Sequence, residues 1–458
     1  MLRVSEHFEF YDRNHLSAFQ KVKSWQKYYS SSITEDCINF MNNEERKCLV
    51  VNLQKQEETT EFSCSIKSSY YIGLDVLPKL DLAVYVEPKL NDDNCKVDYI
   101  QMLLEALKAS ENFDHLDGLI ETKLEKDWIE IKSNLKPILT PFLIAQFLAI
   151  IKDLIRKGLK KSYYTVQENL NSKIKGKILV SQQIKHNISK NRLTKTICEY
   201  QEFGFDTEAN QFLKYVLSIV PNLLSDFIQE KQFSQLNELI HYCKGGFYQV
   251  GNKAFKKLLH YENNPFYRNY NKAIEIGNQI LALQDYNISV DNQQETTLHP
   301  PFWIDMSKLF ELYVFKALKR KFPEEGHLKY HKKYNSQELD FIVNSNGFKA
   351  VIDAKYKPRY TNGNPSMDDA RQLSGYTRLN SVYKELGLGE NDNTIIPAYF
   401  IYPSNLTKGN ENDIEKFEID ALEVTISNSK ALLESDLRKS STYREMFLQE
   451  IKLPVNFV

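Results

Sequence analysis

The chain has 458 residues, of which 42% are hydrophobic, and its formal net charge is −1. The length indicates two or three domains. The near-neutral charge excludes a globally basic nucleic-acid-binding protein, so any DNA-binding surface must be local. The six cysteines form no CxxC pair, and none lies beyond Cys243. Their spacing indicates reduced thiols of an intracellular protein rather than a disulfide framework, a zinc site or an iron–sulfur nuclease.

No stretch of the sequence has the features of a signal peptide or a membrane span. Met1 to His15 is polar and lacks the apolar core of a signal peptide. The most apolar stretch, Pro137 to Ile151, is interrupted by Thr140 and Gln146 and is shorter than the ~18–20 residues that cross a bilayer. Thr140 followed by Pro141 instead predicts the start of a buried helix. We therefore expect a cytoplasmic protein with no membrane partner.

The N-terminal part alternates short apolar runs with polar loops. The clearest predicted strands are Leu49–Val51, Tyr70–Gly73 and Leu82–Val86. This pattern predicts a β-rich region of mixed structure over residues 1–130.

The middle part has the apolar spacing of helices. One helix is predicted from Pro141 to about Lys161 and another from Asn210 to Glu230, where Pro221 is expected to kink or end it. A polar stretch that ends in Pro300-Pro301 marks a boundary. We therefore predict a mostly helical middle region over residues 131–298.

The C-terminal part, residues 299–458, has an orderly mixture of elements. It is predicted to contain a helix, three strands, a second helix and a further strand: Met306–Phe322, His327–Tyr334, Glu338–Val343, Phe348–Lys355, Met367–Leu386 and Thr394–Tyr402. Such mixing predicts a small α/β core. The role of the tail after about Asn405 is left open.

Asn346-Gly347 lies between two apolar strands and predicts a hairpin with a type I′ turn. If the turn is centred there, Phe341 faces Ile352 and Leu339 faces Ala354 on an apolar face that packs on the core. The opposite face then pairs Ile342 with Val351, Asp340 with Asp353, and Glu338 with Lys355. The two aspartates would lie roughly 4.5–5.5 Å apart at Cβ.

Directly opposed like charges destabilise a sheet, so the aspartate pair requires an explanation. A divalent cation supplies one, because Mg²⁺ prefers carboxylate, carbonyl and water oxygens. Asp340, Asp353 and the carbonyl of Ala354 are therefore candidate metal ligands. Lys355 would project on the same face and could activate the attacking water or stabilise charge on phosphorus. The alternative is that both acids lie on a solvated face, with Glu338 and Lys355 as a surface ion pair.

Residues on the two flanking helices could support such a site. Glu311, on the first helix, could bring a third carboxylate to the metal or lie on the helix surface. Gln372 and Tyr376 are four residues apart and share a helix face, from which they could position substrate or a metal-bound water. Basic residues near the site could form a cationic rim for phosphates, or could be solvated: Lys329, Lys332, Lys333, Lys357, Arg359, Arg371 and Arg378.

These motifs resemble those of a known nuclease superfamily. The series Glu311, Asp340, Asp353-Ala354-Lys355 and Gln372-x-x-x-Tyr376 resembles the PD-(D/E)xK nucleases, and the last element resembles their RecB-like branch. Leu339 stands where the motif name has proline. The resemblance implies a restriction-endonuclease-like α/β core and Mg²⁺ as cofactor, with two ions possible and Mn²⁺ able to substitute. The P-loop, G-x-S-x-G and H-E-x-x-H motifs are absent from the sequence.

Longer blocks of the sequence resemble the McrC family. They are, in chain order, Tyr71-Ile72-Gly73 to Val86-Glu87-Pro88-Lys89, Glu168-Asn169-Leu170, Lys175-Gly176-Lys177-Ile178, Cys198 to Phe203, Asp206 to Lys214, Ser307 to Val314, and Ile352 to Lys357. The resemblance implies the nuclease subunit of a McrBC-type 5-methylcytosine restriction system. Its partners would be DNA and an McrB-like AAA+ GTPase hexamer, whose GTPase it stimulates. The resemblance also implies that residues 1–130 bind the partner.

The resemblance implies a set of roles. Asp340 and Asp353 bind the metal with Ala354, Glu311 assists, Lys355 acts on the water or the transition state, and Gln372 and Tyr376 support. Two alternatives remain open at this point. One is a non-catalytic adaptor that activates a AAA+ GTPase, and the other is a stand-alone RecB-like repair nuclease.

Overall fold

The computed structural model is of mixed α/β class and divides into two compact units. One unit combines residues 1–136 with 295–458, and the other is residues 137–294. The regions predicted over 1–130 and 299–458 thus contribute to the same unit. The residues that the structure describes are 2–6, 9–11, 35–41, 45–55, 62–77, 82–91, 95–123, 129–132, 139–225, 234–259, 264, 267–289, 296–334, 337–345, 347–357, 365–389, 392–404, 432–433 and 437–457.

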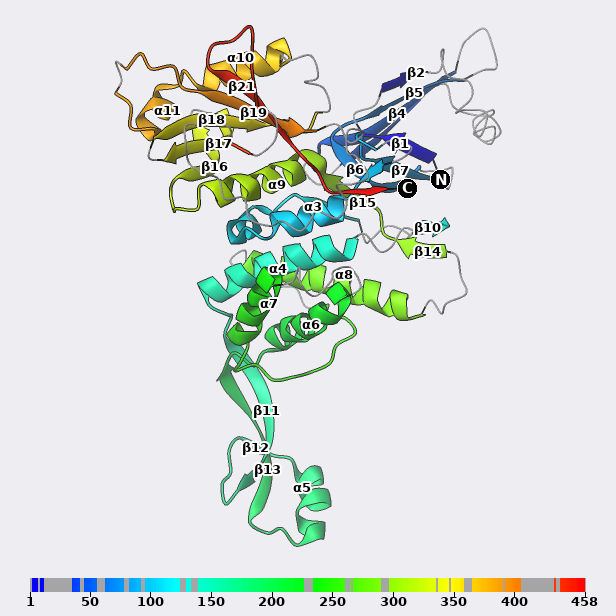
Figure 1. Ribbon diagram of the computed structural model, residues 1–458. Coiled ribbons are helices and arrows are strands. Elements are labelled where there is room, and N and C mark those ends of the chain that lie inside the picture. The colour runs from blue at the N-terminus through cyan, green and yellow to red at the C-terminus, as the bar shows by residue number, and fades with distance from the viewer. Residues whose placement is uncertain are drawn as a thin grey trace. The chain divides into compact units, whose positions relative to one another are not determined.

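The N-terminal part of the first unit is built on two sheets (Figure 1). The five-stranded sheet has the order β1-β7-β6-β15-β9, and the four-stranded sheet has the order β2-β5-β4-β3. Their strands are β1 (Leu2–Ser5), β2 (Glu9–Tyr11), β3 (Glu35–Met41), β4 (Lys47–Lys55), β5 (Phe62–Ser68), β6 (Tyr71–Leu77), β7 (Leu82–Glu87), β9 (Ile120–Thr122) and β15 (Phe302–Asp305). The three strands predicted here correspond to parts of β4, β6 and β7.

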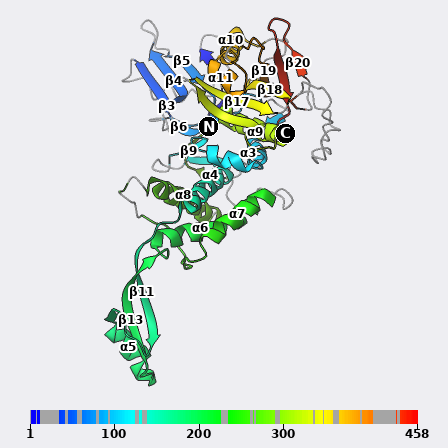
Figure 2. The ribbon, with the colours of Figure 1, turned by 90° about the vertical axis from the view of Figure 1, so that its left-hand side faces the viewer.

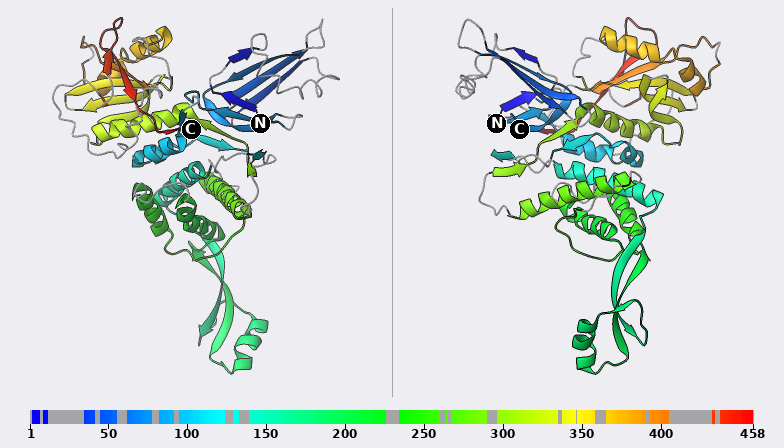
Figure 3. Two further views of the ribbon diagram at one scale, coloured as in Figure 1. Left: turned by 45° about the vertical axis from the view of Figure 1, so that its right-hand side comes forward. Right: turned by 180° about the vertical axis from the view of Figure 1, so that it is seen from behind.

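β6 and β15 approach each other closely at Gly73. A Cβ atom at this position would lie 2.1 Å from the carbonyl oxygen of Phe302, so only glycine fits. This contact joins the N-terminal sheet to the strand that leads directly into helix α9 (Met306–Lys321). Helix α3 (Tyr99–Ala106) lies beside α9 (Figure 3). The buried amide of Asn112 holds the two segments together by donating to the carbonyls of Ala106 and Leu312.

The C-terminal part contains a six-stranded sheet of order β16-β17-β18-β19-β21-β20. β16, β17 and β18 are antiparallel neighbours, whereas β18, β19 and β21 run parallel. Helix α9 covers one face of this sheet and α10 covers the other (Figure 1). The bounds are β16 (Leu328–Tyr334), β17 (Gln337–Ser345), β18 (Phe348–Ala354), α10 (Met367–Tyr376), α11 (Asn380–Glu385), β19 (Ala398–Pro403), β20 (Leu437–Lys439) and β21 (Met446–Ile451).

Most elements of this core lie where the sequence predicts them, with two differences. The single helix predicted over Met367–Leu386 is two helices, because Leu379 adopts an extended conformation (φ −71°, ψ 127°) between them. The tail also has a structural role that the sequence leaves open. It supplies β20 and β21 to the core sheet, and β22 (Val455–Phe457) pairs with β8 (Cys95–Val97).

The second unit combines four helices with a long β-ribbon. The helices are α4 (Leu139–Lys157), α6 (Glu208–Ser225), α7 (Ser234–Gly246) and α8 (Arg268–Ser289). α6 continues through Pro221, so of the two expected effects, a kink or an end, the proline does not produce the end. Val220 and Leu224 are buried on either side of it, and this packing holds the last turn. The predicted end of this helix at Glu230 lies outside the described residues. None of the described helices is both long and apolar enough to cross a membrane.

The ribbon is an element that the sequence analysis does not predict. β11 (Ser162–Asn171) and β13 (Lys195–Gly204) pair along ten residues and lead to a tip formed by β12 (Lys177–Ile178) and α5 (Val180–His186) (Figure 2). We call residues 162–204 the arm. Gly176 has a positive φ of 67° at the tip, and a Cβ there would lie 2.4 Å from the carbonyl oxygen of Glu199.

A buried ion pair lies in the first unit between the N-terminal sheet and the C-terminal core. Lys89 Nζ is 3.3 Å from Glu6 Oε1, and the side chains are 8% and 0% exposed. The ammonium also lies over the rings of Tyr70 and Tyr356, at 4.9 and 4.3 Å from their centroids. Burial raises the pKa of Glu6 to about 7, against the opposing effect of Lys89. Tyr356 lies two residues beyond the end of β18, the strand that carries Asp353, so the pair supports that strand end.

We predict that Lys89→Met destabilises the protein by about 3–5 kcal/mol, because it leaves the carboxyl group of Glu6 buried without its cation. The double variant Glu6→Gln, Lys89→Met should recover most of that loss. Urea unfolding of the four proteins measures the coupling. Lys175→Met is a matched control, because Lys175 also combines an ion pair with an aromatic contact but is 52% exposed, and it should leave stability nearly unchanged. Additive losses in the double variant would contradict the prediction.

Candidate active site

The β17–β18 hairpin has the predicted register. Ser345 pairs with Phe348, Val343 with Ala350, and Phe341 with Ile352. Gly347 has a φ of 89°, as the predicted turn requires, while Asn346 lies outside the described residues. The ladder ends at the Phe341–Ile352 pair, one position before the two aspartates. Asp340 and Asp353 are therefore not joined through the strand ladder.

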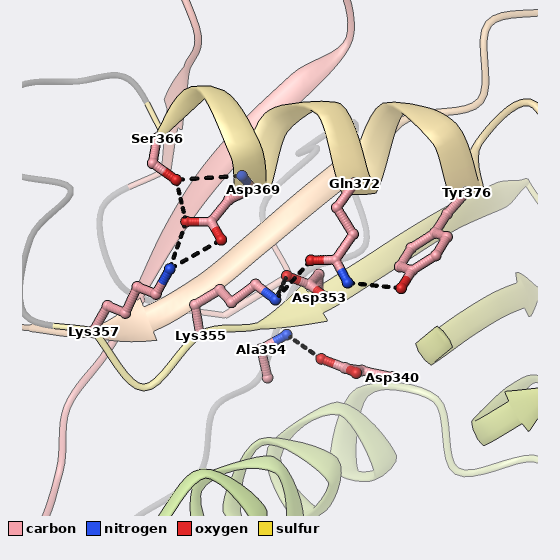
Figure 4. A network of polar contacts seen from close by, with 9 residues as sticks. All are labelled: Asp340, Asp353, Ala354, Lys355, Lys357, Ser366, Asp369, Gln372 and Tyr376. Carbon is pink, nitrogen blue, oxygen red and sulfur yellow. Dashed lines mark hydrogen bonds and ion pairs between the residues drawn. The ribbon is translucent and has the colours of Figure 1, made fainter. Parts of the chain in front are cut away.

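A side-chain hydrogen bond continues the connection between the strands beyond that point. Asp340 Oδ2 accepts the backbone N–H of Ala354 at 2.8 Å (Figure 4). Asp353 is 3% exposed, and its Oδ2 lies 2.9 Å from Lys355 Nζ. The structure thus brings Asp340, Asp353, Ala354 and Lys355 together at one place. Because the strands separate there, carboxylate oxygens and a lysine occupy the space that a ladder pair would fill.

The face opposite Phe341 is not a solvated face. Ile342 and Val351 are fully buried in a cluster with Leu373 of α10, so this face is also covered. The predicted cross-strand pair of Glu338 with Lys355 is not part of the ladder, and the surface ion pair of the alternative interpretation is absent from the described contacts of both residues. Lys355 contacts Asp353 instead, and Glu338 lies 3.3 Å from both Lys333 Nζ and His331 Nδ1. The β17–β18 ladder ends before it reaches the positions of Glu338 and Lys355.

The pKa values of the two aspartates are both raised by their surroundings. Burial raises the pKa of Asp340 well above its ordinary value, and the charges of Asp353 and Glu311 raise it further. Burial also raises the pKa of Asp353, although Lys355 opposes this. The pKa of Lys355 would fall by burial, but the neighbouring carboxylates, chiefly that of Asp353, outweigh the effect and raise it. Negative charge at this place is therefore incompletely compensated by the protein.

Helix α10 holds the lysine from above the sheet. Ser366 caps the helix by accepting the N–H of Asp369 at 3.2 Å. One and a half turns further on, Lys355 Nζ donates to Gln372 Oε1 at 3.3 Å, and Gln372 Nε2 donates to the Tyr376 hydroxyl at 2.8 Å (Figure 4). Gln372 and Tyr376 therefore share a face, as expected, and reach the site through Lys355 rather than through the aspartates.

Asp369 forms a second charged group with Lys357 of the predicted basic rim, and the sequence analysis does not assign Asp369 to the site. Lys357 Nζ contacts both carboxylate oxygens of Asp369 at 2.9 Å, and Ser366 Oγ donates to Oδ2 at 2.5 Å. The charge of Asp369 also raises the pKa of Asp353. The position of Asp369 in the first turn of a helix is the only sequence signal for it.

Glu311 approaches the aspartates from α9, on the other face of the sheet. Its charge contributes to the raised pKa of both Asp340 and Asp353. Its Oε2 atom is held by two residues of β16, because it accepts the Tyr330 hydroxyl at 3.2 Å and lies 2.7 Å from His331 Nε2. His331 is a site neighbour that the sequence analysis misses, since nothing in the sequence shows that its backbone departs from the strand.

The predicted basic rim is largely engaged in ion pairs. Lys329 contacts Glu385, Lys333 contacts Glu338 at 3.3 Å, and Arg371 contacts Asp368 at 3.7 Å. Arg359 lies outside the described residues. Lys332 and Arg378 are exposed. A continuous cationic rim around the site therefore stays a prediction.

Comparison with known families decides the affiliation of the chain. A family model described as the McrBC 5-methylcytosine restriction system component matches residues 66–386, more than half of the sequence. The chain belongs to this McrBC family. The matched stretch contains all the residues of the candidate site, from Glu311 to Tyr376.

Comparison with solved structures finds two McrBC assemblies that are similar to this chain. A half-complex of Thermococcus gammatolerans McrB AAA+ hexamers with bound McrC is similar at 19% identity and a TM-score of 0.37, covering 98% of this chain and 94% of that one. The cryo-EM structure of the McrBC complex of the same organism is similar at 17% identity and a TM-score of 0.26, covering 73% and 89%. No curated protein matches the chain.

The donor set of this McrBC family member suits a hard divalent cation. Asp353 Oδ2 is buried and makes no hydrogen bond within the described part of the chain, and its contact with Lys355 is an ion pair. Among the described residues, no three His, Cys, Asp or Glu side chains are grouped closely enough to hold a metal by themselves. Mg²⁺ is commonly bound by one or two carboxylates and keeps several waters. Asp340, Asp353 and the Ala354 carbonyl therefore fit Mg²⁺ better than a dehydrated, all-protein metal site.

We predict that Asp340→Asn stabilises the metal-free protein by a few tenths to about 1 kcal/mol, because it removes one of two neighbouring carboxylates. The asparagine oxygen can still accept the N–H of Ala354. Urea unfolding in the presence of a chelator measures the change. Asp368→Asn is the matched control, since this side chain is 95% exposed, and should leave stability unchanged. A loss of stability in Asp340→Asn would show that the carboxylate is structural.

Proposed function

We propose that this chain is the nuclease subunit of a McrBC-type restriction system, and that it hydrolyses DNA phosphodiester bonds with Mg²⁺ at a PD-(D/E)xK core. The observation that carries the proposal is the convergence of Asp340, Asp353 and Lys355 where β17 and β18 separate. The covering of this sheet by α9 and α10 on opposite faces supports it. Membership in the McrBC family supports the restriction function.

The proposed cation would be held by the carboxylates of Asp340 and Asp353 and by the carbonyl of Ala354. When bound, it would supply a Lewis acid that polarises the phosphate and acidifies a water molecule. The raised pKa of both aspartates is consistent with this role, since a cation would relieve the repulsion that burial intensifies. The same arrangement is costly to a protein that binds no cation.

Lys355 is assigned to the charge that develops on the phosphate. In hydrolysis a water oxygen bonds to phosphorus as the bond to the leaving oxygen breaks, and negative charge grows on the phosphoryl oxygens. Without a cation, the neighbouring carboxylates raise the pKa of Lys355, which favours its ammonium form. An ammonium ion cannot accept a proton from water, which favours charge stabilisation over general-base catalysis. Gln372 and Tyr376 hold the ammonium group in place.

We predict that Asp353→Ala lowers DNA cleavage by the assembled complex at least ~100-fold while its stimulation of the partner GTPase is retained. Cleavage of methylated plasmid with Mg²⁺ and GTP, and GTP hydrolysis in the same samples, measure the two activities. Asp368→Ala controls for loss of an acidic side chain beside the site and should cut normally.

Retained cutting by Asp353→Ala would reject the nuclease assignment and favour a non-catalytic activator of the GTPase. Equal cutting by the wild-type chain without partner or GTP would instead favour a stand-alone repair nuclease. Mg²⁺-dependent cutting that needs both partner and GTP is the outcome that this proposal expects.

The partner of this subunit is proposed to be an McrB-like AAA+ GTPase hexamer, and the arm is the described surface best suited to bind it. The tip exposes large apolar side chains that a solvated structure does not need: Ile174, Val180, Ile184, Ile188 and Leu193, each more than half exposed. From Ser172 to Lys195 the sequence has no Asp or Glu, and its basic residues are Lys173, Lys175, Lys177, Lys185, Lys190, Arg192 and Lys195. A basic and apolar tip fits an acidic protein surface with apolar pockets.

We predict that Ile184→Asp weakens binding to the GTPase partner about 10-fold or more, because it places a charge at an apolar contact. Ile184 is 51% exposed, so the change should not affect folding. Ile395→Asp is the matched control, since Ile395 is 46% exposed outside the arm, and should bind normally. Affinity measured by biolayer interferometry tests this. Normal binding by Ile184→Asp would contradict the role of the arm and favour residues 1–130 as the partner-binding region.

A further inference from the structure

One residue of the core sheet has a backbone conformation that its strand does not require. His331 lies inside β16 but has a φ of 50°, in the left-handed region that non-glycine residues rarely adopt. The ladder between β16 and β17 omits this position, since Tyr330 pairs with Phe341 and Lys332 with Leu339, whereas His331 and Asp340 do not pair. The irregularity therefore lies directly beside the first aspartate of the proposed site.

The distortion directs the imidazole at a carboxylate of the neighbouring helix. His331 Nε2 lies 2.7 Å from Glu311 Oε2, and Nδ1 lies 3.3 Å from Glu338 Oε1. The imidazole ring also packs against Tyr330, with ring centroids 4.0 Å apart, and the Tyr330 hydroxyl donates to the same Glu311 oxygen. Glu311 is thus held from β16 by two donors, one of which exists only because the backbone is distorted.

Ring packing accounts for part of this arrangement. The side chain of His331 is 29% exposed, and its ring centroid lies 4.0 Å from that of Tyr330 and 6.5 Å from that of His115. A left-handed backbone is strained at histidine relative to glycine, and such strain persists where the surrounding structure enforces it. The shortest contact of His331 is the 2.7 Å contact of its Nε2 atom with Glu311, which a glycine at this position could not make.

We propose that His331 is a positioning residue, which fixes the carboxylate of Glu311 toward Asp340 and so completes the negatively charged environment of a divalent cation. The inference rests on the proposed function. Hydrogen bonds to metal-binding carboxylates and their neighbours typically change metal affinity by about 10–100-fold. None of the described hydrogen bonds and ion pairs joins Glu311 to Asp340 or Asp353. Glu311 would therefore act on the cation by charge or through water, at a distance that His331 maintains.

The test compares stability with cation binding in the full-length chain, without partner or DNA. His331→Gly removes the imidazole and suits the left-handed backbone, so the melting temperature of the metal-free protein should be unchanged or higher. Mn²⁺ binding, followed by loss of the electron paramagnetic resonance signal of the free ion, should weaken about 10-fold. His331→Asn, which tolerates the same backbone and keeps a side-chain donor, should retain affinity within about 3-fold of the wild type.

His327→Gly is the matched control, because His327 also pairs with a glutamate, Glu324, at 3.1 Å but away from the aspartates, and it should bind Mn²⁺ normally. Asp353→Ala distinguishes a failure of the cation site from a failure of the role proposed for His331. Loss of Mn²⁺ binding in Asp353→Ala with normal binding in His331→Gly overturns the role of His331 alone. Normal binding in Asp353→Ala overturns the cation site. A lower melting temperature in His331→Gly overturns the positioning role, since the imidazole would then be structural.

Discussion

The structure depends on how one buried and one half-buried carboxylate, those of Asp353 and Asp340, are tolerated at the place where β17 and β18 separate. Asp340 and Asp353 lie beside each other, and burial raises the pKa of both. The protein supplies one backbone N–H to Asp340 and one ammonium group to Asp353. This compensation is partial, and a fold selected for stability alone would replace at least one of the acids. The proposed cation would complete the charge balance.

The surrounding elements are arranged around that deficit. From one face, α10 holds Lys355 through Gln372 and Tyr376, while its first turn binds Lys357 through Asp369. From the other face, α9 brings Glu311, which β16 holds through Tyr330 and His331. The buried Glu6–Lys89 pair supports the strand end from the N-terminal sheet, through the ring of Tyr356. Helices, strands and the N-terminal part of the unit thus all contribute to positioning a few charged atoms.

What the sequence reveals of this arrangement is mainly local. The Asn346-Gly347 turn and the apolar alternation predict the hairpin and its register correctly from Phe341 to Ser345, because turn geometry fixes which residues face each other. Helix α9 and strands β16 to β18 are also predicted, because the spacing of their apolar residues is a local property of the sequence. The Glu338–Lys355 pair is predicted wrongly, because the strands diverge at the acids and no local pattern reports where a ladder ends.

The remaining features depend on contacts between distant parts of the chain. The pairing of β19 with β21, the burial of Ile342 under α10 and the Glu6–Lys89 pair each join residues far apart in the sequence, and single-sequence patterns do not encode them. The arm is missed because exposed strands rich in polar and charged residues lack the apolar alternation of a half-buried strand. His331 is missed because backbone strain has no signature in residue type.

The central claim is that Asp340 and Asp353 form a divalent-cation site. The most direct measurement is anomalous diffraction from crystals of the chain grown with Mn²⁺. The account predicts an anomalous peak roughly 2.0–2.2 Å from carboxylate oxygens of both aspartates and from the carbonyl oxygen of Ala354. Crystals that contain Mn²⁺ at other positions but show no peak between Asp340 and Asp353 would contradict it.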